Sequence, residues 1–562
     1  MKLKIVTILS FLIVLVGCND LDLNPLAEGA TGNWYSDETE IEMSLNDLYR
    51  DPFWKLDNDY WTDDWIYRGT TNSITGGTMN GEDRDMLEWW SHTYKGVTRA
   101  NTVIQSLDNI SNAVSEDKLN QYKADARFCR AGQNARLITH WGDAIYSNTI
   151  MSLEESFNME RTDKEVILQG IYEDYDFAAT YLPESYGTDE NKHATKGAAL
   201  AMKARIALYM EDYETARDAA KACMDLGVYE LYPSYRELFL SSTKNSVETI
   251  FALPRSEELG NYRSDCQNFT TRNAGGWASH DPSWELFCAF LCTDGLPIDE
   301  SPLFDPHNPF KNRDPRCAET IVAFQSEHLG YMYQPHPDSL TVLNFNSGQY
   351  VTNNDTKSNA AYASFNGLAW RKGIDTDWSD NKRTDPDKII MRYADVLLMY
   401  AEAKIELNEI DESVFDAINQ VRARAYGVSV DDVANYPAVT VTDQAELRKE
   451  LRIERRMELA FEGRRYMDLM RWKLAEKTLN IPTYGLLDVA ELREKVVNQG
   501  LWFFPETPEI DEDGIADFSP MYNAGLIKLL GLRTFDASKQ YLWPIPSKEI
   551  LINENLVQNE GY

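Results

Sequence analysis

The chain has 562 residues, of which 43% are hydrophobic and 12% aromatic, so it is long enough for several domains and a large packed core. Its formal net charge of −35 argues against nucleic acid and anionic lipid as partners, because a field of that sign repels both. Neutral ligands need no opposite charge and stay compatible with it.

The first residues predict a lipoprotein signal. Lys2 and Lys4 form a short basic region, residues 5–16 are mostly apolar, and a Leu-Val-Gly-Cys sequence ends at Cys18. The apolar stretch is too short to span roughly 30 Å of hydrocarbon as a mature helix, so it indicates a cleaved signal. Acyl chains on Cys18 would anchor the mature chain outside the cytoplasm. The alternative is an ordinary secretory signal with an incidental cysteine.

We expect the other cysteines to be mainly small buried residues. Two of them lie four positions apart in a helical pattern, which disfavours a disulfide between them. No CxxC pair or Cys/His spacing suggests zinc. A disulfide among the more distant ones stays open. The six are Cys129, Cys223, Cys266, Cys288, Cys292 and Cys317.

Helical periodicity begins near Asp37 and is clearest in two similar segments. Residues 196–227 predict two helices with a turn at 211–213, and small side chains recur where the helices would approach. Residues 392–427 repeat this pattern. Helix–turn–helix units of about 34 residues with small residues at the crossing are typical of tetratricopeptide-like repeats. The copies are too far apart in the sequence for a regular solenoid.

The segment between these units has a different character. Residues 233–391 are rich in Asn, Pro, Gly and Ser, and they show few helical periods. Loops of this length in a compact protein are usually functional. We therefore predict a mainly α fold, a tetratricopeptide-like helical-hairpin scaffold with a loop-rich insert containing short strands. The predicted division is a signal peptide at 1–17, a helical part at 18–232, the ligand-binding insert at 233–391 and a helical part at 392–562, with both inner boundaries inside one compact fold.

Within the helical stretch 445–479, glutamates recur at every fourth position from 446 to 462. Like charges at this spacing oppose an isolated helix by roughly 0.2–0.5 kcal/mol per pair, so basic partners should come from other segments. A structural ion network is the favoured interpretation. The glutamates are Glu446, Glu450, Glu454, Glu458 and Glu462, and the candidate partners are Arg422, Arg424, Arg464 and Arg465.

Catalytic motifs are not found in the sequence. It lacks GxGxxG, the P-loop, GxSxG and HExxH, and its seven histidines include no pair three or four positions apart. An EF-hand-like start at Glu509 fails, because Pro520 stands where a bidentate glutamate is required. We therefore predict no enzyme and no cofactor. The sequence does not decide whether a structural calcium supports a loop.

Aromatic side chains cluster in polar surroundings, which is the combination that sugar recognition needs. A flat ring covers the C–H face of a pyranose while amides, carboxylates and guanidinium groups bond its hydroxyls. Trp61 and Trp65 lie in such a segment, and Trp277 follows a Gly-Gly pair in a second one. The alternative for each tryptophan is a place in the core, which is favoured for the helical Trp89, Trp90 and Trp284.

Eight stretches, in order, resemble the SusD/RagB family of surface lipoproteins. They are WWSHTYKGVTRANTVI, ADARFCRAGQNARLITHWGD, TKGAALAMKARIALYMEDYETA, LCTDGLPI, KNRDPRCAETI, IMRYADVLLMYAEAKIELNE, ERRMELAFEGRRYMDLMRW and YLWPIPSKEILINENLVQNEGY. Together with the signal they cover essentially the whole chain.

The resemblance implies a lipid-anchored protein on the outer-membrane surface that takes part in polysaccharide utilisation. Such proteins bind an oligosaccharide and help to deliver it to a SusC-like TonB-dependent transporter, and the family has no known catalytic activity. Its ligand site lies in variable loops, so it implies regions of this chain. Those regions contain the candidate ligand-binding residues Trp61, Trp65, Tyr67, Arg68, Asn72 and Trp277.

Four hypotheses follow, and a glycan-binding lipoprotein is favoured. The second is the same scaffold binding peptide or another nutrient. The third is a glycoside hydrolase, which requires two carboxylates roughly 5–10 Å apart in an aromatic cleft. The fourth is a protein-interaction scaffold without a concave aromatic site.

Overall fold

The computed structural model describes residues 35–562 except 36, 109, 111–113, 188–192 and 375. The predicted signal peptide and Cys18 lie outside the described residues. Helices account for 42% and strands for 10%, which confirms a mainly α fold. Within the described part of the chain, no helix is both long enough and apolar enough to cross a bilayer.

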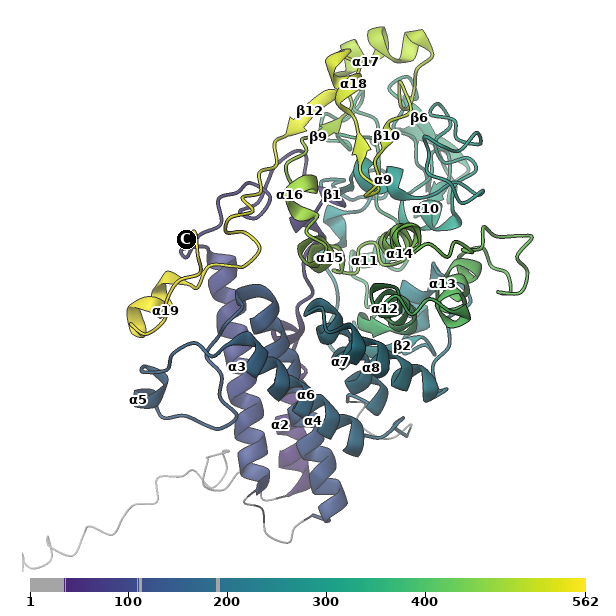
Figure 1. The fold of residues 1–562 in the computed structure, drawn as a ribbon. Helices are drawn as coiled ribbons and strands as arrows, with labels where there is room; N and C mark the ends of the chain where they lie inside the picture. The colour runs from purple at the N-terminus through teal and green to yellow at the C-terminus, as the bar shows by residue number, and fades with distance from the viewer. Residues whose placement is uncertain (1–34, 36, 109, 111–113, 188–192, 375) are drawn as a thin grey trace, which may run out of the picture.

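The longer helices of the N-terminal part pack in sequence order, each against the next (Figure 1). Most begin at an Asp, Ser or Thr whose side chain accepts a hydrogen bond from a backbone N–H in the first turn. Their bounds are Glu38–Leu48 (α2), Arg84–Asp108 (α3), Glu116–Trp141 (α4), Lys164–Tyr181 (α6), Lys196–Tyr209 (α7) and Tyr213–Asp225 (α8), with a single turn at Leu153–Ser156 (α5).

The two predicted helical pairs lie side by side. Helix α8 packs against α12 (Tyr393–Glu406), which packs in turn against α13 (Glu412–Ala425) and α14 (Gln444–Glu458). Fully buried alanines, among them Ala204, Ala216 and Ala220, allow α7 and α8 to approach closely. The helices that follow α14 in the C-terminal part are Arg465–Arg471 (α15), Ala475–Thr478 (α16), Val489–Lys495 (α17), Ser519–Asn523 (α18) and Ser547–Ile552 (α19).

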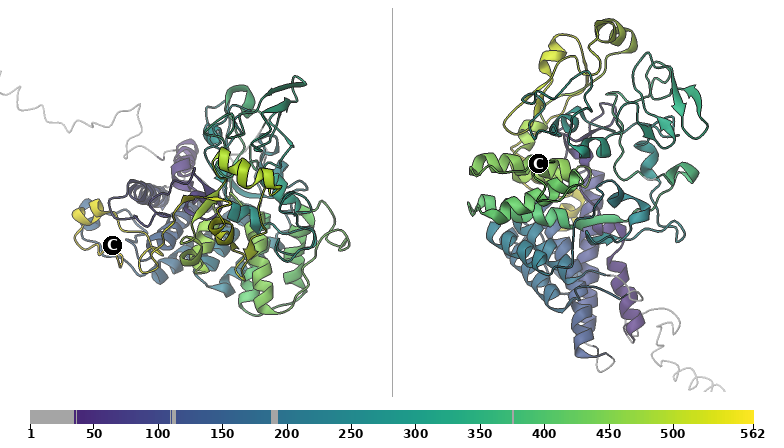
Figure 2. Two further views of the ribbon diagram at one scale, coloured as in Figure 1. Left: turned by 90° about the horizontal axis from the view of Figure 1, so that it is seen from above. Right: turned by 90° about the vertical axis from the view of Figure 1, so that its right-hand side faces the viewer.

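The insert leaves and rejoins the helical scaffold at one place, because β2 (Thr249–Leu253) pairs antiparallel with β8 (Lys388–Arg392). Phe251 of β2 packs against Phe128 of α4, with ring centroids 5.2 Å apart, whereas most of the insert lies away from helices α2 to α6 (Figures 1 and 2). The insert contains one four-stranded antiparallel sheet and short helices. The strands are Glu327–His328 (β4), Tyr331–Met332 (β5), Thr341–Asn344 (β6) and Gln349–Thr352 (β7), and the helices are Trp284–Ala289 (α9), Pro315–Thr320 (α10) and Trp378–Asn381 (α11).

Three further antiparallel pairs join short strands. They are β1 (Trp65–Ile66) with β3 (Asp281–Pro282), β9 (Thr483–Gly485) with β12 (Lys528–Gly531), and β10 (Glu509–Ile510) with β11 (Ala516–Asp517). Turns of 3₁₀ helix lie at Asp51–Trp54, Asp59–Trp61, Glu237–Phe239, Ser241–Thr243, Asp265–Asn268 and Val497–Gln499. The short strands and the scaffold confirm the predicted fold class. The residue boundaries of its parts stay a prediction.

A buried ion network ties the insert to the helical scaffold through Glu458 at the end of α14. Its carboxylate accepts from Arg316 of the insert at 2.9 Å, from Arg392 at 2.6 Å, and from Arg424 of α13. All four side chains are almost fully buried. Burial opposes ionisation of Glu458, but the three guanidinium groups outweigh it and hold its pKa well below the usual range.

The predicted partners of the glutamate series are half correct. Arg422 contacts Glu450 and Glu454, and Arg424 contacts Glu458, as predicted. Arg464 and Arg465 instead form ion pairs with aspartates outside the series, Asp395 and Asp63. The six cysteines named above are free and buried, which confirms their interpretation as small buried residues.

Candidate functional site

A short strand pair brings the N-terminal segment to the surface of the insert. Trp65 lies opposite Pro282 and Ile66 opposite Asp281, and a tight turn follows in which the Thr70 N–H donates to Tyr67 O at 2.7 Å. The turn needs left-handed backbone at its two central residues, with φ of 47° at Arg68 and 81° at Gly69. This turn therefore holds Arg68 at its tip.

A second loop presents Trp277. Its backbone N–H donates to Gln267 O at 2.7 Å, and its side chain is 50% exposed. The preceding Gly276 is required by space, because a Cβ there would lie 2.1 Å from Thr270 O. An indole held on a fixed loop and open to solvent is available to a ligand.

Arg68 joins Trp277 to a third loop. Its Nη2 donates to Trp277 O at 3.0 Å, and its guanidinium carbon lies 5.1 Å from the ring centroid of Tyr362, which is 62% exposed. Arg272 supports the same arrangement by donating to the carbonyl oxygens of Trp277 and Tyr362 at 3.1 and 3.4 Å. Two loops that each carry an exposed ring thus meet at a guanidinium group, from segments about 90 to 300 residues apart.

Beside Arg68, the Tyr67 ring stacks on the imidazole of His280, with centroids 4.6 Å apart and planes 16° from parallel. Burial, followed by the nearby Arg68 charge, lowers the pKa of His280 to about 4. The imidazole is therefore neutral at physiological pH. We call Tyr67, Arg68, Trp277, His280 and Tyr362 the aromatic patch.

The structure brings together three of the six predicted ligand-binding residues, Tyr67, Arg68 and Trp277. It corrects the expectation for Trp61, which is only 8% exposed. The Trp61 ring packs against Trp89, Tyr466 and Trp543 with centroids 5.3 to 5.4 Å apart. Trp61 is thus a core residue, and a ligand on the surface cannot stack on it.

Trp65 and Asn72 shape the site from beneath. Trp65 is 9% exposed, and its ring meets those of His280 and Phe269 edge-on. The Asn72 amide donates to Tyr60 O at 2.7 Å and accepts from two backbone N–H groups of the following turn. Asn72 therefore contributes turn structure, and the expectation that it faces a ligand does not fit its position. Trp65 is largely buried next to His280, but it also lines a cavity described below, so its role as a ligand-binding residue stays a prediction.

Tyr362, His280 and Arg272 belong to the site although the sequence did not single them out. Tyr362 stands in the stretch NAAYASFNG, where no periodicity separates an exposed ring from a buried one. Its importance follows from the contact with Arg68, which no local pattern encodes.

A cavity of about 320 Å³ lies behind Trp65. Its wall includes Trp370, which stacks on Phe461 with centroids 3.5 Å apart, and the buried Asp59. Asp59 Oδ2 accepts from the Gly463 N–H at 3.1 Å, whereas Oδ1 has no hydrogen-bond partner among the described residues. Burial, followed by the charge of Asp64, raises the pKa of Asp59 to about 8.

Two carboxyl groups lie under the aromatic patch. Asp281 follows His280 on β3, and Asp355 accepts from the Arg272 N–H at 2.6 Å. Both side chains are buried, and this burial raises the pKa of Asp355 to about 6 and that of Asp281 well above its ordinary value. In the described part of the chain, no cluster of three or more His, Cys, Asp or Glu side chains is placed to hold a metal ion.

Two family models match this chain. One, described as the SusD family, covers residues 247–562, and the other, described as starch-binding associating with outer membrane, covers residues 36–208. Among curated proteins, SusD-like protein P2 of Formosa agariphila is 25% identical over the whole of both chains.

Solved structures share the fold. A SusD-like carbohydrate-binding protein of Bacteroides fragilis is 28% identical with a TM-score of 0.77, covering 93% of this chain and 100% of that one. A second SusD-like protein of the same species is 25% identical with a TM-score of 0.72, covering 95% and 99%.

Proposed function

This chain belongs to the SusD family, and we propose from that premise that it is a cell-surface lipoprotein that captures oligosaccharide on the aromatic patch. It would then pass the oligosaccharide to a SusC-like TonB-dependent transporter of the outer membrane. The similar carbohydrate-binding protein of Bacteroides fragilis and the family description of starch binding support a glycan as the ligand.

The observation that carries this proposal is the joining of Trp277 and Tyr362 by Arg68. Both rings are at least half exposed, and the Arg68 guanidinium contacts the backbone carbonyl of Trp277 and the ring of Tyr362. Exposed rings can cover the apolar faces of sugar units, and a guanidinium group can donate to their hydroxyls. The Tyr67–His280 stack extends this surface with a neutral platform.

The burial of the two carboxyl groups under the aromatic patch agrees with binding without hydrolysis. A glycosidase needs an acid and a second carboxylate in contact with the scissile bond. Asp281 and Asp355 lie beneath the rings and are buried, so a ligand on the patch does not reach them. We therefore infer a binding protein, and incubation with a bound glycan should release no new reducing ends.

Native gel electrophoresis with a panel of plant, host and microbial polysaccharides tests the glycan proposal. We expect one class of polysaccharide to retard the protein. Trp277→Ala and Tyr362→Ala should each weaken that retardation, because each removes an exposed ring whose burial contributes on the order of 1.5–3 kcal/mol, or roughly tenfold in affinity or more.

Tyr181→Ala is the matched control, because Tyr181 is also exposed but lies on α6 of the helical scaffold. Unchanged retardation of a folded Trp277→Ala protein would contradict the assignment of the site. Retardation by no glycan would favour a peptide or another nutrient as the ligand.

The lipid anchor and the transporter complete the proposal. The sequence ending at Cys18 supports lipidation, and the second family model is described as associating with the outer membrane. We expect Cys18→Ala to move the protein from the membrane fraction to the soluble fraction. We also expect the wild-type protein to co-purify with an outer-membrane transporter of the bacterium that produces it. Purification of the protein without any transporter would contradict the partnership.

A further inference from the structure

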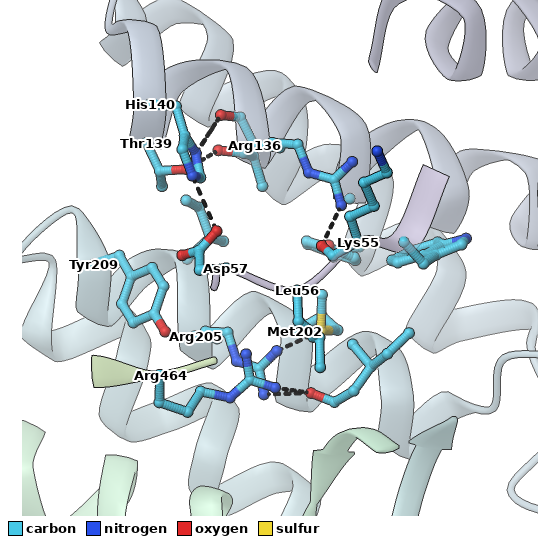
Figure 3. Close-up of a pocket in the computed structure, with 16 residues that line it drawn as sticks. Lys55, Leu56, Asp57, Arg136, Thr139, His140, Met202, Arg205, Tyr209 and Arg464 are labelled. Carbon is cyan, nitrogen blue, oxygen red and sulfur yellow. Dashed lines mark hydrogen bonds and ion pairs between the residues drawn. The ribbon is translucent and has the colours of Figure 1, made fainter. Parts of the chain in front are cut away.

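A second cavity, of about 100 Å³, lies inside the helical scaffold between α4, α7 and the segment at residues 54–57 (Figure 3). It shares no lining residue with the aromatic patch. Arg136 of α4, Arg205 of α7 and Arg464 all line it. Figure 3 shows the Arg136 guanidinium on one side of the cavity and those of Arg205 and Arg464 together on the other.

Positive charge is in excess around this cavity. Arg205 and Arg464 share Asp395, with contacts of 2.7 and 3.5 Å, and both donate to the carbonyl oxygen of Ile390. Asp395 is shared again with Arg455 at 3.2 Å. Asp395 therefore divides its charge among three guanidinium groups, of which Arg455 also pairs with Asp468 at 3.3 Å.

Asp57 is the carboxylate that lines the cavity directly. Its Oδ1 lies 3.1 Å from His140 Nε2. It forms no ion pair within 4 Å with any of the three arginines, so it offsets their charge only from a distance. Burial lowers the pKa of Arg136 to about 10, and the charge of Asp57 opposes that shift without cancelling it.

Several donors at the cavity have no protein partner. A guanidinium group has five N–H donors, and Arg136 donates to Lys55 O at 2.9 Å through Nη2. Tyr175 and Arg205 also line the cavity, and the Tyr175 hydroxyl and Arg205 Nε are buried without a hydrogen-bond partner among the described residues. Buried donors that remain unpaired are costly, so they favour a ligand that accepts hydrogen bonds.

We propose that this cavity binds a small oxyanion, either a free ion such as sulfate or phosphate or the carboxylate of an acidic sugar, through donors of Arg136, Arg205 and Tyr175. Charge-assisted hydrogen bonds from guanidinium groups to carboxylate, sulfate or phosphate oxygens are strong and directional. The anion would compensate charge that the protein leaves unpaired between α4 and α7. The site is therefore expected to stabilise the scaffold independently of glycan binding.

Thermal unfolding of the purified protein tests the site, with sodium sulfate, phosphate or glucuronate compared with chloride at equal ionic strength. We expect at least one oxyanion to raise the unfolding midpoint in a saturable manner. Saturation by glucuronate alone would assign an acidic sugar, and saturation by sulfate or phosphate would assign a free ion.

Tyr175→Phe is the most selective variant, because it removes only a hydroxyl without a protein partner. Without added oxyanion, Tyr175→Phe should be at least as stable as the wild type. Its apparent affinity for the oxyanion should fall roughly tenfold or more. Arg136→Gln should abolish the effect. Tyr172→Phe is the control on the same helix, because the Tyr172 hydroxyl donates to Asp212 at 3.0 Å and does not line the cavity.

Two results would overturn the proposal. One is that no oxyanion stabilises the protein more than chloride, in which case the cavity holds only water. The other is that Tyr175→Phe and Arg136→Gln respond like the wild type. Trp277→Ala should retain the full anion effect, so failure of the glycan site and failure of this site are distinguishable.

Discussion

At the scale of single residues, Asp59 illustrates a carboxyl group that burial keeps protonated. Its pKa of about 8 in the folded protein compares with an ordinary value of 3.8. Between these values the folded state holds a proton that the unfolded state has lost, so the free energy of unfolding decreases as pH rises. The decrease from this one group is at most about 1.4 kcal/mol per pH unit.

Asp59→Asn should remove this dependence. The variant keeps an acceptor for the Gly463 N–H and cannot ionise, so it should gain stability relative to the wild type as pH rises from 5 to 8. Urea unfolding at pH 5, 6.5 and 8 measures the difference. A difference that stays constant across this range would contradict the raised pKa.

Trp61 and Trp277 show what residue-level prediction from sequence can and cannot reach. Both stand in polar, glycine-containing stretches, and both were predicted to face a ligand. The sequence around Trp277 contains its own reason for exposure, a glycine pair that forces a tight loop. The burial of Trp61 depends on Tyr466 and Trp543, hundreds of residues away, so no local pattern could reveal it.

At the scale of elements, α14 carries the charges that hold the insert. Glu458→Gln keeps the size of the side chain but removes its negative charge. Arg316, Arg392 and Arg424 then lose a shared carboxylate partner in a buried site. Breaking a buried ion network in this way costs about 3–5 kcal/mol. We therefore expect the free energy of unfolding to fall by this order at pH 7, as measured by urea unfolding.

The same helix offers the control. Glu446→Gln changes an exposed member of the glutamate series near the start of α14 and should cost less than about 1 kcal/mol. Because the folded-state pKa of Glu458 is depressed, its contribution is present above pH 4.5 and is lost as pH falls below that value. Equal effects of the two substitutions at pH 7 would contradict the role of the network.

Among the elements, the helices were predictable and most strands were not. Small residues at helical spacing located α7, α8, α12 and α13. Two helices that cross closely each need small residues at the contact, so the pattern is visible in the sequence of each helix alone. Strand pairs such as β1 with β3 are two residues long and join segments more than 200 residues apart. Their formation depends on tertiary contacts, so the sequence indicated only that short strands occur in the insert.

At the scale of the whole molecule, the aromatic patch exists only in the assembled chain. Arg68 comes from the N-terminal part, and Trp277 and Tyr362 come from distant loops of the insert. The β1–β3 pair and the network around Glu458 hold these parts in place. The sequence could therefore identify the family resemblance and the general region of the site, whereas the set of residues that meet there required the fold.

Hydrogen–deuterium exchange, with and without a glycan that retards the protein, tests whether the aromatic patch is the ligand site. We expect slower exchange in the loops around Arg68, Trp277 and Tyr362 when the glycan is present, and no such protection in Trp277→Ala. Protection confined to the helical scaffold, with these three loops unchanged, would contradict the assignment of the aromatic patch as the ligand site.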